Sequence, residues 1–160
     1  MGHQQILTIA SIFLLSTLIL NVHSATTERI TTMYSNESVI TASGIAQSII
    51  DELQTKGFDE KTIYKMVTKT DSLTQANFLG KDAGETLSIQ FDDIDDYDTY
   101  TRTDSLNRMG KFNTKVSVYY IDKNNPDTKS SIRTFTKRVD VQITNFSFPD
   151  TLKFYHIIGY

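Results

Sequence analysis

Residues Ile6–Leu20 read ILTIASIFLLSTLIL and are apolar except for Thr8, Ser11, Ser16 and Thr17. Hydroxyl groups can donate back to helix carbonyls, so this segment can enter lipid as a helix. Its helical rise of only about 22 Å is short of the ~30 Å hydrocarbon core of a bilayer. The side chains predicted to lie in the membrane are Ile6, Leu7, Ile9, Ile12, Phe13, Leu14, Leu15, Leu18, Ile19 and Leu20.

The stretch without charged residues is longer than this apolar segment. Residues 1–27 contain no Asp, Glu, Lys or Arg, and all 16 basic and 19 acidic side chains occur from Glu28 onward. As a helix, the charge-free stretch would reach roughly 40 Å, which is enough to span the core. We therefore divide the chain into a membrane-anchor part, residues 1–27, and a globular head, residues 28–160.

Three interpretations of the N-terminal segment compete. It can be a secretory signal that is cut near Ser24/Ala25, although Met1–Gln5 lacks the usual basic residues. It can be a plain single-pass anchor, for which flanking positive charges are also absent. In the third interpretation, which we favour, the apolar helix continues without a break into an amphipathic one and serves first as an anchor and then as a packing surface.

Nothing in the sequence forces this helix to stop early. No proline precedes Pro126, and Gly44 is the only glycine between Gly2 and Gly57. Apolar residues recur at spacings of three and four, as on one face of a helix. These residues are Ile30, Met33, Tyr34, Ile45, Ala46, Ile49, Ile50 and Leu53.

The pattern predicts one helix over residues 5–56, of which 28–56 belongs to the head. Its weakest part is 25–32, where four threonines lower the helix propensity and favour a kink. The apolar face of the head part needs a partner surface to cover it.

Residues 114–160 change to a period of two, which is typical of half-buried strands. Strands are predicted over Thr114–Ile121, Thr134–Thr144 and Leu152–Ile158, with Asn125–Asp127 as a hairpin connection. Lys137 is the one charged residue on the apolar side of the second strand, and we expect its stem to snorkel outward. Three antiparallel strands with one apolar face are not stable alone, so the helix face is the expected cover.

Between the helix and the sheet, residues 57–113 are predicted to form a loop region. Within it, Phe58–Lys69 favours a helical turn with Asp59 as the N-cap, and Thr86–Phe91 favours a short strand. Together these elements predict an α+β fold, in which a long N-terminal helix packs on a small C-terminal antiparallel sheet.

Composition excludes several classes of function. The 160 residues suit one domain, and a net charge of −3 gives no electrostatic support for binding nucleic acid. Since the chain has no cysteine, it has no disulfide, no thiolate nucleophile and no Cys-ligated metal. With three histidines and no tryptophan, it offers little material for a catalytic centre. We expect no enzymatic activity and no cofactor.

One acidic segment is a weak candidate for calcium binding. Five carboxylates fall within seven residues, and carboxylate oxygens are the ligands that Ca²⁺ prefers. The spacing does not match an EF-hand, because a glycine at the sixth position and a glutamate at the twelfth are missing. We favour a solvated acidic loop over a metal site for these residues, which are Asp92, Asp93, Asp95, Asp96 and Asp98.

The order of a charge-free helix, an amphipathic continuation, a loop region and an antiparallel meander resembles the type IV pilin superfamily, including the pseudopilins of type II secretion. Finer motifs are similar to minor pilins of the PilV-like group. They are the helix end AQSIIDEL leading into Phe58-Asp59, the acidic FDDIDDY, and the strand sequences VSVYYID and KRVDV.

This resemblance implies a structural or assembly subunit of an envelope filament or secretion apparatus. Such a subunit is held in the inner membrane by a single span, and its head is exported to the periplasm or the cell exterior. Its partners are the membrane, other pilin-like subunits that contact its N-terminal helix, and the secretion or pilus assembly machinery. Nucleic acid is not among them.

Members of this family are processed after a glycine, and a glutamate follows five residues later. Here Gly2 is the processing candidate, the leader would be Met1-Gly2, and Leu7 stands where the glutamate is usual. A subunit without that glutamate resembles one placed at a filament tip or one never incorporated. The alternative, from a different class, is a secreted or lipid-anchored binding domain whose signal is cut near Ser24/Ala25.

Overall fold

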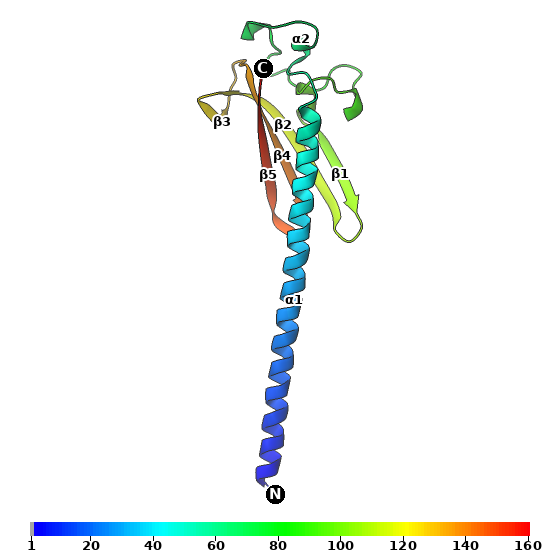
Figure 1. The fold of residues 1–160 in the computed structure, drawn as a ribbon, viewed down its shortest axis with the longest axis vertical. Helices are drawn as coiled ribbons and strands as arrows, with labels where there is room; N and C mark the ends of the chain where they lie inside the picture. Colours follow the sequence, from blue (N-terminus) through cyan, green and yellow to red (C-terminus); the bar gives the residue numbers. More distant parts are fainter. Residues whose placement is uncertain (1) are drawn as a thin grey trace.

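The computed structural model describes residues 2–160 and shows a long helical rod that carries a small sheet at one end (Figure 1). Helix α1 runs over Gly2–Leu53, and its last third lies against the sheet while the rest extends away from it. The predicted α+β arrangement of one long helix on an antiparallel sheet is therefore confirmed. The N-terminus of the described chain lies at the free end of the rod.

Helix α1 is unbroken, as predicted, even across the threonine-rich stretch 25–32 that was the weakest part of the predicted helix. The hydroxyls of Thr26, Thr27, Thr31 and Thr32 each donate to the carbonyl four residues earlier, at 2.8 to 3.0 Å. These bonds leave none of the four hydroxyls unpaired along the exposed rod. The helix ends at Leu53 rather than residue 56, because Thr55 and Lys56 already donate to carbonyls three residues back.

The face of α1 that covers the sheet begins later than the apolar pattern predicted. Ile30, Met33 and Tyr34 remain 46%, 58% and 41% exposed, so the prediction that they pack on the sheet was wrong. They lie on the part of the rod below the head, where the sheet does not reach. The helix residues that are buried are Ser38, Ala42, Ala46, Ile49, Ile50 and Leu53.

The sheet has five antiparallel strands, of which the main four lie in the order β1-β2-β4-β5, and β3 pairs with the far end of β2. The strands are β1 Thr101–Leu106, β2 Gly110–Asp122, β3 Asn125–Lys129, β4 Thr136–Asn145 and β5 Phe148–Gly159. The three predicted strands correspond to β2, β4 and β5. The prediction missed β1, and it placed a hairpin turn where β3 forms.

Short helices occupy the region between α1 and the sheet: α2 Glu60–Ile63, η1 Thr70–Ser72, η2 Ser88–Gln90 and η3 Asp95–Tyr97. The predicted helical turn with Asp59 as its N-cap is confirmed, since an Asp59 carboxylate oxygen accepts a hydrogen bond from the Lys61 amide at 3.0 Å. The predicted strand over Thr86–Phe91 was wrong, because the Gln90 side chain binds the amides of Thr86 and Leu87 and curls this segment into η2.

The core lies between the buried face of α1 and one face of the sheet. Alternate residues of β2 and β4 point into it, with Val116 and Val118 facing Val139 and Val141 from adjacent strands. Above them, Phe91, Tyr97 and Tyr100 form an edge-to-face aromatic cluster with ring centroids 5.0 to 5.8 Å apart. This packing fixes the acidic segment against the end of the helix.

Two glycines give opposite predictions for the stability of the head. Gly110 begins β2 with a φ of +72°, a conformation that side chains rarely adopt, and an added methyl would meet the Phe146 ring. We expect Gly110→Ala to lower the free energy of unfolding by about 1–2 kcal/mol.

Gly44 is helical and exposed, with open space around it. Gly44→Ala should therefore raise the free energy of unfolding by up to about 1 kcal/mol. Denaturant unfolding of the two variants measures both changes.

Candidate functional site

The apolar part of α1 presents a continuous surface without a partner in the described residues 2–160. The large side chains between Ile6 and Leu20 are 57% to 69% exposed, although each would be buried in an ordinary core. Within the described residues 2–160, α1 is the one helix that is long and apolar enough to cross a membrane, on length and composition alone. Water is therefore an unfavourable environment for this surface.

The polar side chains of the same segment are satisfied inside the helix. Thr8 and Ser16 donate to carbonyls four residues earlier, and Ser11 and Thr17 donate to carbonyls three residues earlier, at 2.8 to 2.9 Å. The segment therefore presents no unsatisfied hydroxyl to lipid or to a neighbouring helix. Gly2 begins the helix, while Met1, the other residue of the expected leader, lies outside the described residues.

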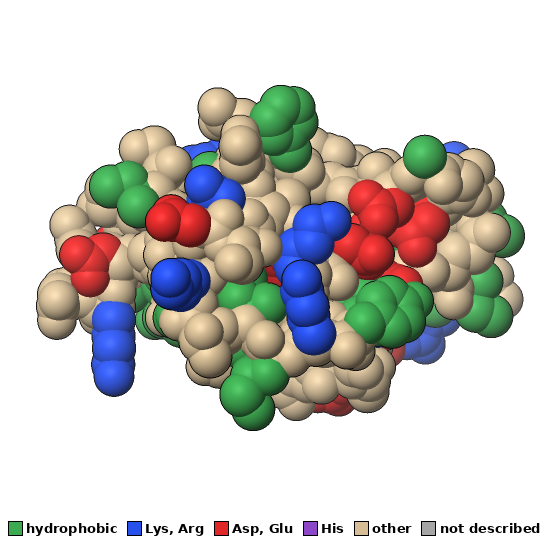
Figure 2. Space-filling model, turned by 90° about the horizontal axis from the view of Figure 1, so that it is seen from above, with side chains coloured by type: hydrophobic (Ala, Val, Ile, Leu, Met, Phe, Trp, Pro, Cys, Tyr) green, Lys and Arg blue, Asp and Glu red, His purple; other side chains and the backbone are tan. Residues whose placement is uncertain are grey.

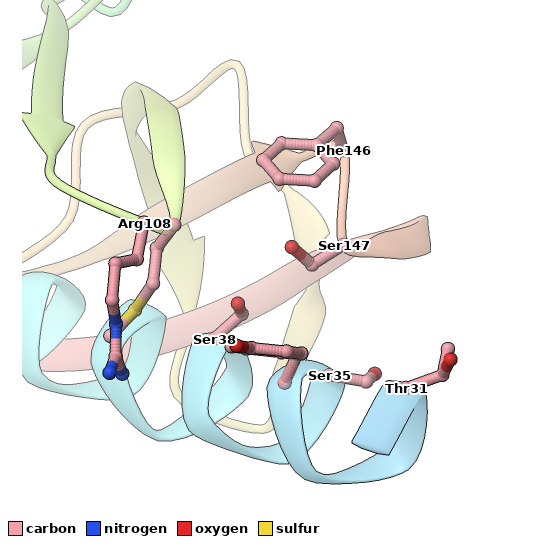
Figure 3. A pocket seen from close by; sticks show the side chains of 8 residues that line it. Thr31, Ser35, Ser38, Arg108, Phe146 and Ser147 are labelled. Atoms are coloured by element: carbon pink, nitrogen blue, oxygen red, sulfur yellow. The ribbon is translucent and has the colours of Figure 1, made fainter. Parts of the chain in front are cut away.

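A pocket of about 560 Å³ lies where the rod enters the head (Figure 3). Helix residues form one side, and the turns before β2 and before β5 form the other. Arg108 crosses from its turn to α1, where its guanidinium binds the Glu37 carboxylate at 2.8 Å. The sequence did not point to this pocket, because its residues come from three separate segments: Thr31, Tyr34, Ser35, Ser38, Arg108, Met109, Phe146 and Ser147.

A second polar site lies at the opposite end of the head, just beyond the end of α1. Figure 2 views the molecule from this side and shows acidic side chains gathered together. Gly57 links the helix end to the acidic segment, since its amide donates to Asp92 and its carbonyl accepts from Ile94, both at 2.9 Å. A side chain at residue 57 would collide with Ile63, so this close approach needs glycine.

The acidic segment is not the solvated loop that was predicted. Asp93, Asp95 and Asp96 are 2% to 3% exposed. Asp93 accepts from the amide of Asp95 at 2.6 Å, and Asp96 accepts from the amide of Asp92 at 3.1 Å. Asp93 and Asp96 are buried because their side chains hold the loop's own backbone amides, which a count of charges does not reveal.

The five calcium candidates do not converge on one point. Asp98 accepts from the Val118 amide at 2.9 Å and ties the loop to β2. Among the described residues, one group of three acidic side chains lies close enough to share an ion, and it consists of Asp92, Asp96 and Glu85. The sequence did not single out Glu85. Burial, reinforced by a hydrogen bond and charge from Asp96, raises the pKa of Glu85.

We expect calcium to leave the stability of the protein unchanged. Asp96 is one of three carboxylates in this group, and one of its oxygens is already engaged by backbone amides. Millimolar CaCl₂ should therefore not raise the melting temperature of the detergent-solubilised full chain, because only a bound ion stabilises by mass action. A calcium-dependent rise of several degrees, absent with MgCl₂, would contradict this prediction.

Lys137 is fully buried instead of snorkelling outward as predicted. Its Nζ donates to Asp95 at 2.5 Å, to the Phe58 carbonyl at 2.7 Å and to Asp59 at 3.2 Å. The side chain turns inward because Phe58 and Asp59, which follow α1, and Asp95 of the acidic segment together supply oxygen acceptors above β4. A residue that breaks the apolar alternation of a strand was the only sequence signal for this site.

The carboxyl groups around Lys137 have pKa values that are shifted in different directions, although burial raises each of them. It raises the pKa of Asp93 to about 8, with the charges of Asp95 and Asp96 adding to the effect. It also raises the pKa of Asp95 to about 7, against the lowering effect of Lys137. For Asp59 the raising effect of burial is outweighed by Lys137 and by hydrogen bonds from Thr74, Lys61 and Tyr120, so the pKa is lowered.

These shifts predict that the head loses stability as the pH rises. Because the pKa of Asp93 goes from 3.8 to about 8, the folded state holds a proton that the unfolded state releases between these values. The melting temperature of the full chain in detergent should fall by several degrees from about pH 5 to about pH 8.5. Asp93→Asn should flatten this slope, and an unchanged slope in the variant would contradict the assignment to Asp93.

No family model, no curated protein and no solved structure matches the chain.

Proposed function

We propose that this protein is a pilin-like subunit, anchored in a membrane by the apolar part of α1 and contributing to an envelope filament or a secretion apparatus. One observation supports this proposal most: α1 is a single continuous helix. Its first part is apolar and exposed, and its last part packs on the core of the head. The proposal gives the protein a structural role and no catalytic one.

Two surroundings can cover the exposed surface of the apolar segment. In a bilayer, lipid chains cover it and its backbone is bonded internally. Outside a bilayer, only other apolar helices can cover it. Burial of roughly 1,000 Å² at about 25 cal/mol per Å² corresponds to tens of kcal/mol before entropy costs, so extraction and assembly with similar helices are naturally coupled.

The rigid join between rod and head supports the same role. The helix passes from the apolar segment to the core without a break, and the Arg108–Glu37 ion pair links the sheet to the rod at the point of entry. A pull on the head is thus transmitted directly to the anchor. A flexible linker, as expected of a tethered binding domain, is not what the residues around Ala25 form.

A photo-crosslinking experiment in the native cells tests the proposal. A benzophenone amino acid replaces Phe13 in the apolar segment, and in a matched control it replaces Tyr64, which is 83% exposed on the head. We expect the Phe13 position to form adducts with chains that carry a similar N-terminal helix, including copies of this chain. Adducts with lipid alone from Phe13 would contradict a subunit role while leaving the membrane anchor intact.

A further inference from the structure

The environment of Lys137 combines an amine with two carboxyl groups inside the protein. The amine and the carboxylate of Asp59 are fully buried, and the Asp95 side chain is 4% exposed. Nζ lies 2.5 Å from Asp95 Oδ1 and 3.2 Å from Asp59 Oδ2. Groups held at this separation react at effective concentrations far above those in solution.

Aromatic rings enclose the amine. The Phe58 ring centroid lies 4.5 Å from Nζ, and that of Tyr120 lies 5.0 Å away. The Tyr120 hydroxyl donates to Asp59 Oδ2 at 3.0 Å, which fixes this carboxylate beside the amine. Such an enclosure excludes water, so the electrostatic interactions inside it are strong and a product amide is protected from hydrolysis.

The two carboxyl groups are not equivalent. Asp59 accepts hydrogen bonds from Lys61, Thr74 and Tyr120 in addition to Lys137, which favours its ionised form. Asp95 Oδ2 is buried and has no hydrogen-bond partner among the described residues. A carboxyl with one free buried oxygen favours the protonated form, in agreement with its raised pKa. Such a difference assigns acid and base roles within a pair.

We propose that Lys137 and Asp95 condense to an intramolecular isopeptide bond, with Asp59 acting as the base. The bond joins β4 to the acidic segment and, through it, fixes the end of α1 to the sheet. It is a covalent modification made from the chain's own residues.

The reaction balances without any co-reactant. The Nζ ammonium gives one proton to Asp95, and the lone pair of the resulting amine attacks Asp95 Cγ to form the N–C bond. The nitrogen of this adduct then gives a second proton to Asp59. The proton on Asp59 is passed to the leaving oxygen, the C–O bond breaks, and one water departs. The two protons lost by nitrogen leave with that water, no group is oxidised or reduced, and Asp59 returns to its starting state.

Condensation also removes a costly pair of charges. A buried ammonium and carboxylate both lose their hydration, and their mutual attraction only partly compensates. The amide that replaces them is neutral. The protein environment therefore favours the product more than bulk water would.

Mass spectrometry of the unaltered protein tests this directly. We expect an intact mass below that of the processed sequence by one water, about 18 Da. A tryptic digest should yield a branched peptide in which residues 82–102 are joined to residues 134–138, with no cleavage after Lys137. Fragment ions should place the branch at Asp95 and Lys137.

Matched variants test the roles of nucleophile and base. The measured mass of each variant is compared with the mass calculated from its own sequence. Lys137→Arg removes the nucleophile, and Asp59→Asn removes the base, so both should show no loss of water. Asp98→Asn alters a carboxylate of the same segment that binds the Val118 amide, and it should retain the full loss. Unmodified full-length mass in all wild-type molecules, with separate linear peptides, would overturn the proposal and leave an ordinary ion pair. Since the wild-type measurement is decisive by itself, a variant that fails to fold does not affect the outcome.

Discussion

Replacing Leu14 by arginine should release the protein from the membrane. Leu14 lies near the middle of the apolar segment and is 67% exposed along the rod. An arginine at the centre of a membrane helix costs about 3 kcal/mol, which corresponds to a shift of roughly 100-fold in partition. Membrane flotation followed by immunoblotting measures the bound fraction.

The head supplies the control for this experiment. Ile132 is also apolar and 73% exposed, but it lies in the loop between β3 and β4, so Ile132→Arg should leave the membrane-bound fraction unchanged. The melting temperature of the head should be the same in both variants, since neither site is in the core. Equal flotation of Leu14→Arg and the wild type would show that residues 6–20 do not hold the protein in the bilayer.

Removing the charge of the Lys137 side chain should strongly destabilise the head. Lys137→Met keeps a similar volume but leaves Asp59 and Asp95 without their buried cation. Loss of one partner of a buried pair typically costs about 3–5 kcal/mol. The same variant loses the contacts that join β4 to the acidic segment, whether Lys137 is held as an ion or as the amide proposed above.

Denaturant unfolding of the detergent-solubilised chain measures this cost. Lys115→Met is the matched control, because Lys115 lies on the neighbouring strand β2 with its side chain exposed, and it should change the free energy of unfolding by less than about 0.5 kcal/mol. Similar effects of the two substitutions would mean that Lys137 does not organise the top of the head.

The long helix and the main strands were predictable because each depends on local periodicity. The spacing of Ala46, Ile49, Ile50 and Leu53 marks a helix face whatever it packs against, and the alternation in β4 marks a strand in the same way. In contrast, β1 reads TRTDSL and has no apolar alternation, because it pairs along an edge of the sheet and is largely exposed. Its identity as a strand comes from its partner β2.

The polar site at the end of the head was not predictable for a different reason. The patterns around Lys137 and around Asp93 and Asp95 are each typical of solvated charges. They become buried because Gly57 permits a close approach between the segment after α1 and the acidic segment. This brings acceptors from two regions of the chain, Phe58-Asp59 and Asp95, over one lysine. Such long-range pairing of opposite charges leaves no local signal beyond a misplaced lysine on a strand.

In the proposed subunit, the apolar segment remains part of the mature protein as the first part of one continuous helix. Sequencing the N-terminus of the protein extracted from native membranes shows whether the segment is retained. We expect the mature chain to begin before Ile6, at Met1, at Gly2, or at His3 after removal of a two-residue leader. A mature N-terminus at Ala25 would show that the segment is a discarded signal and that the protein is not held in the membrane by it.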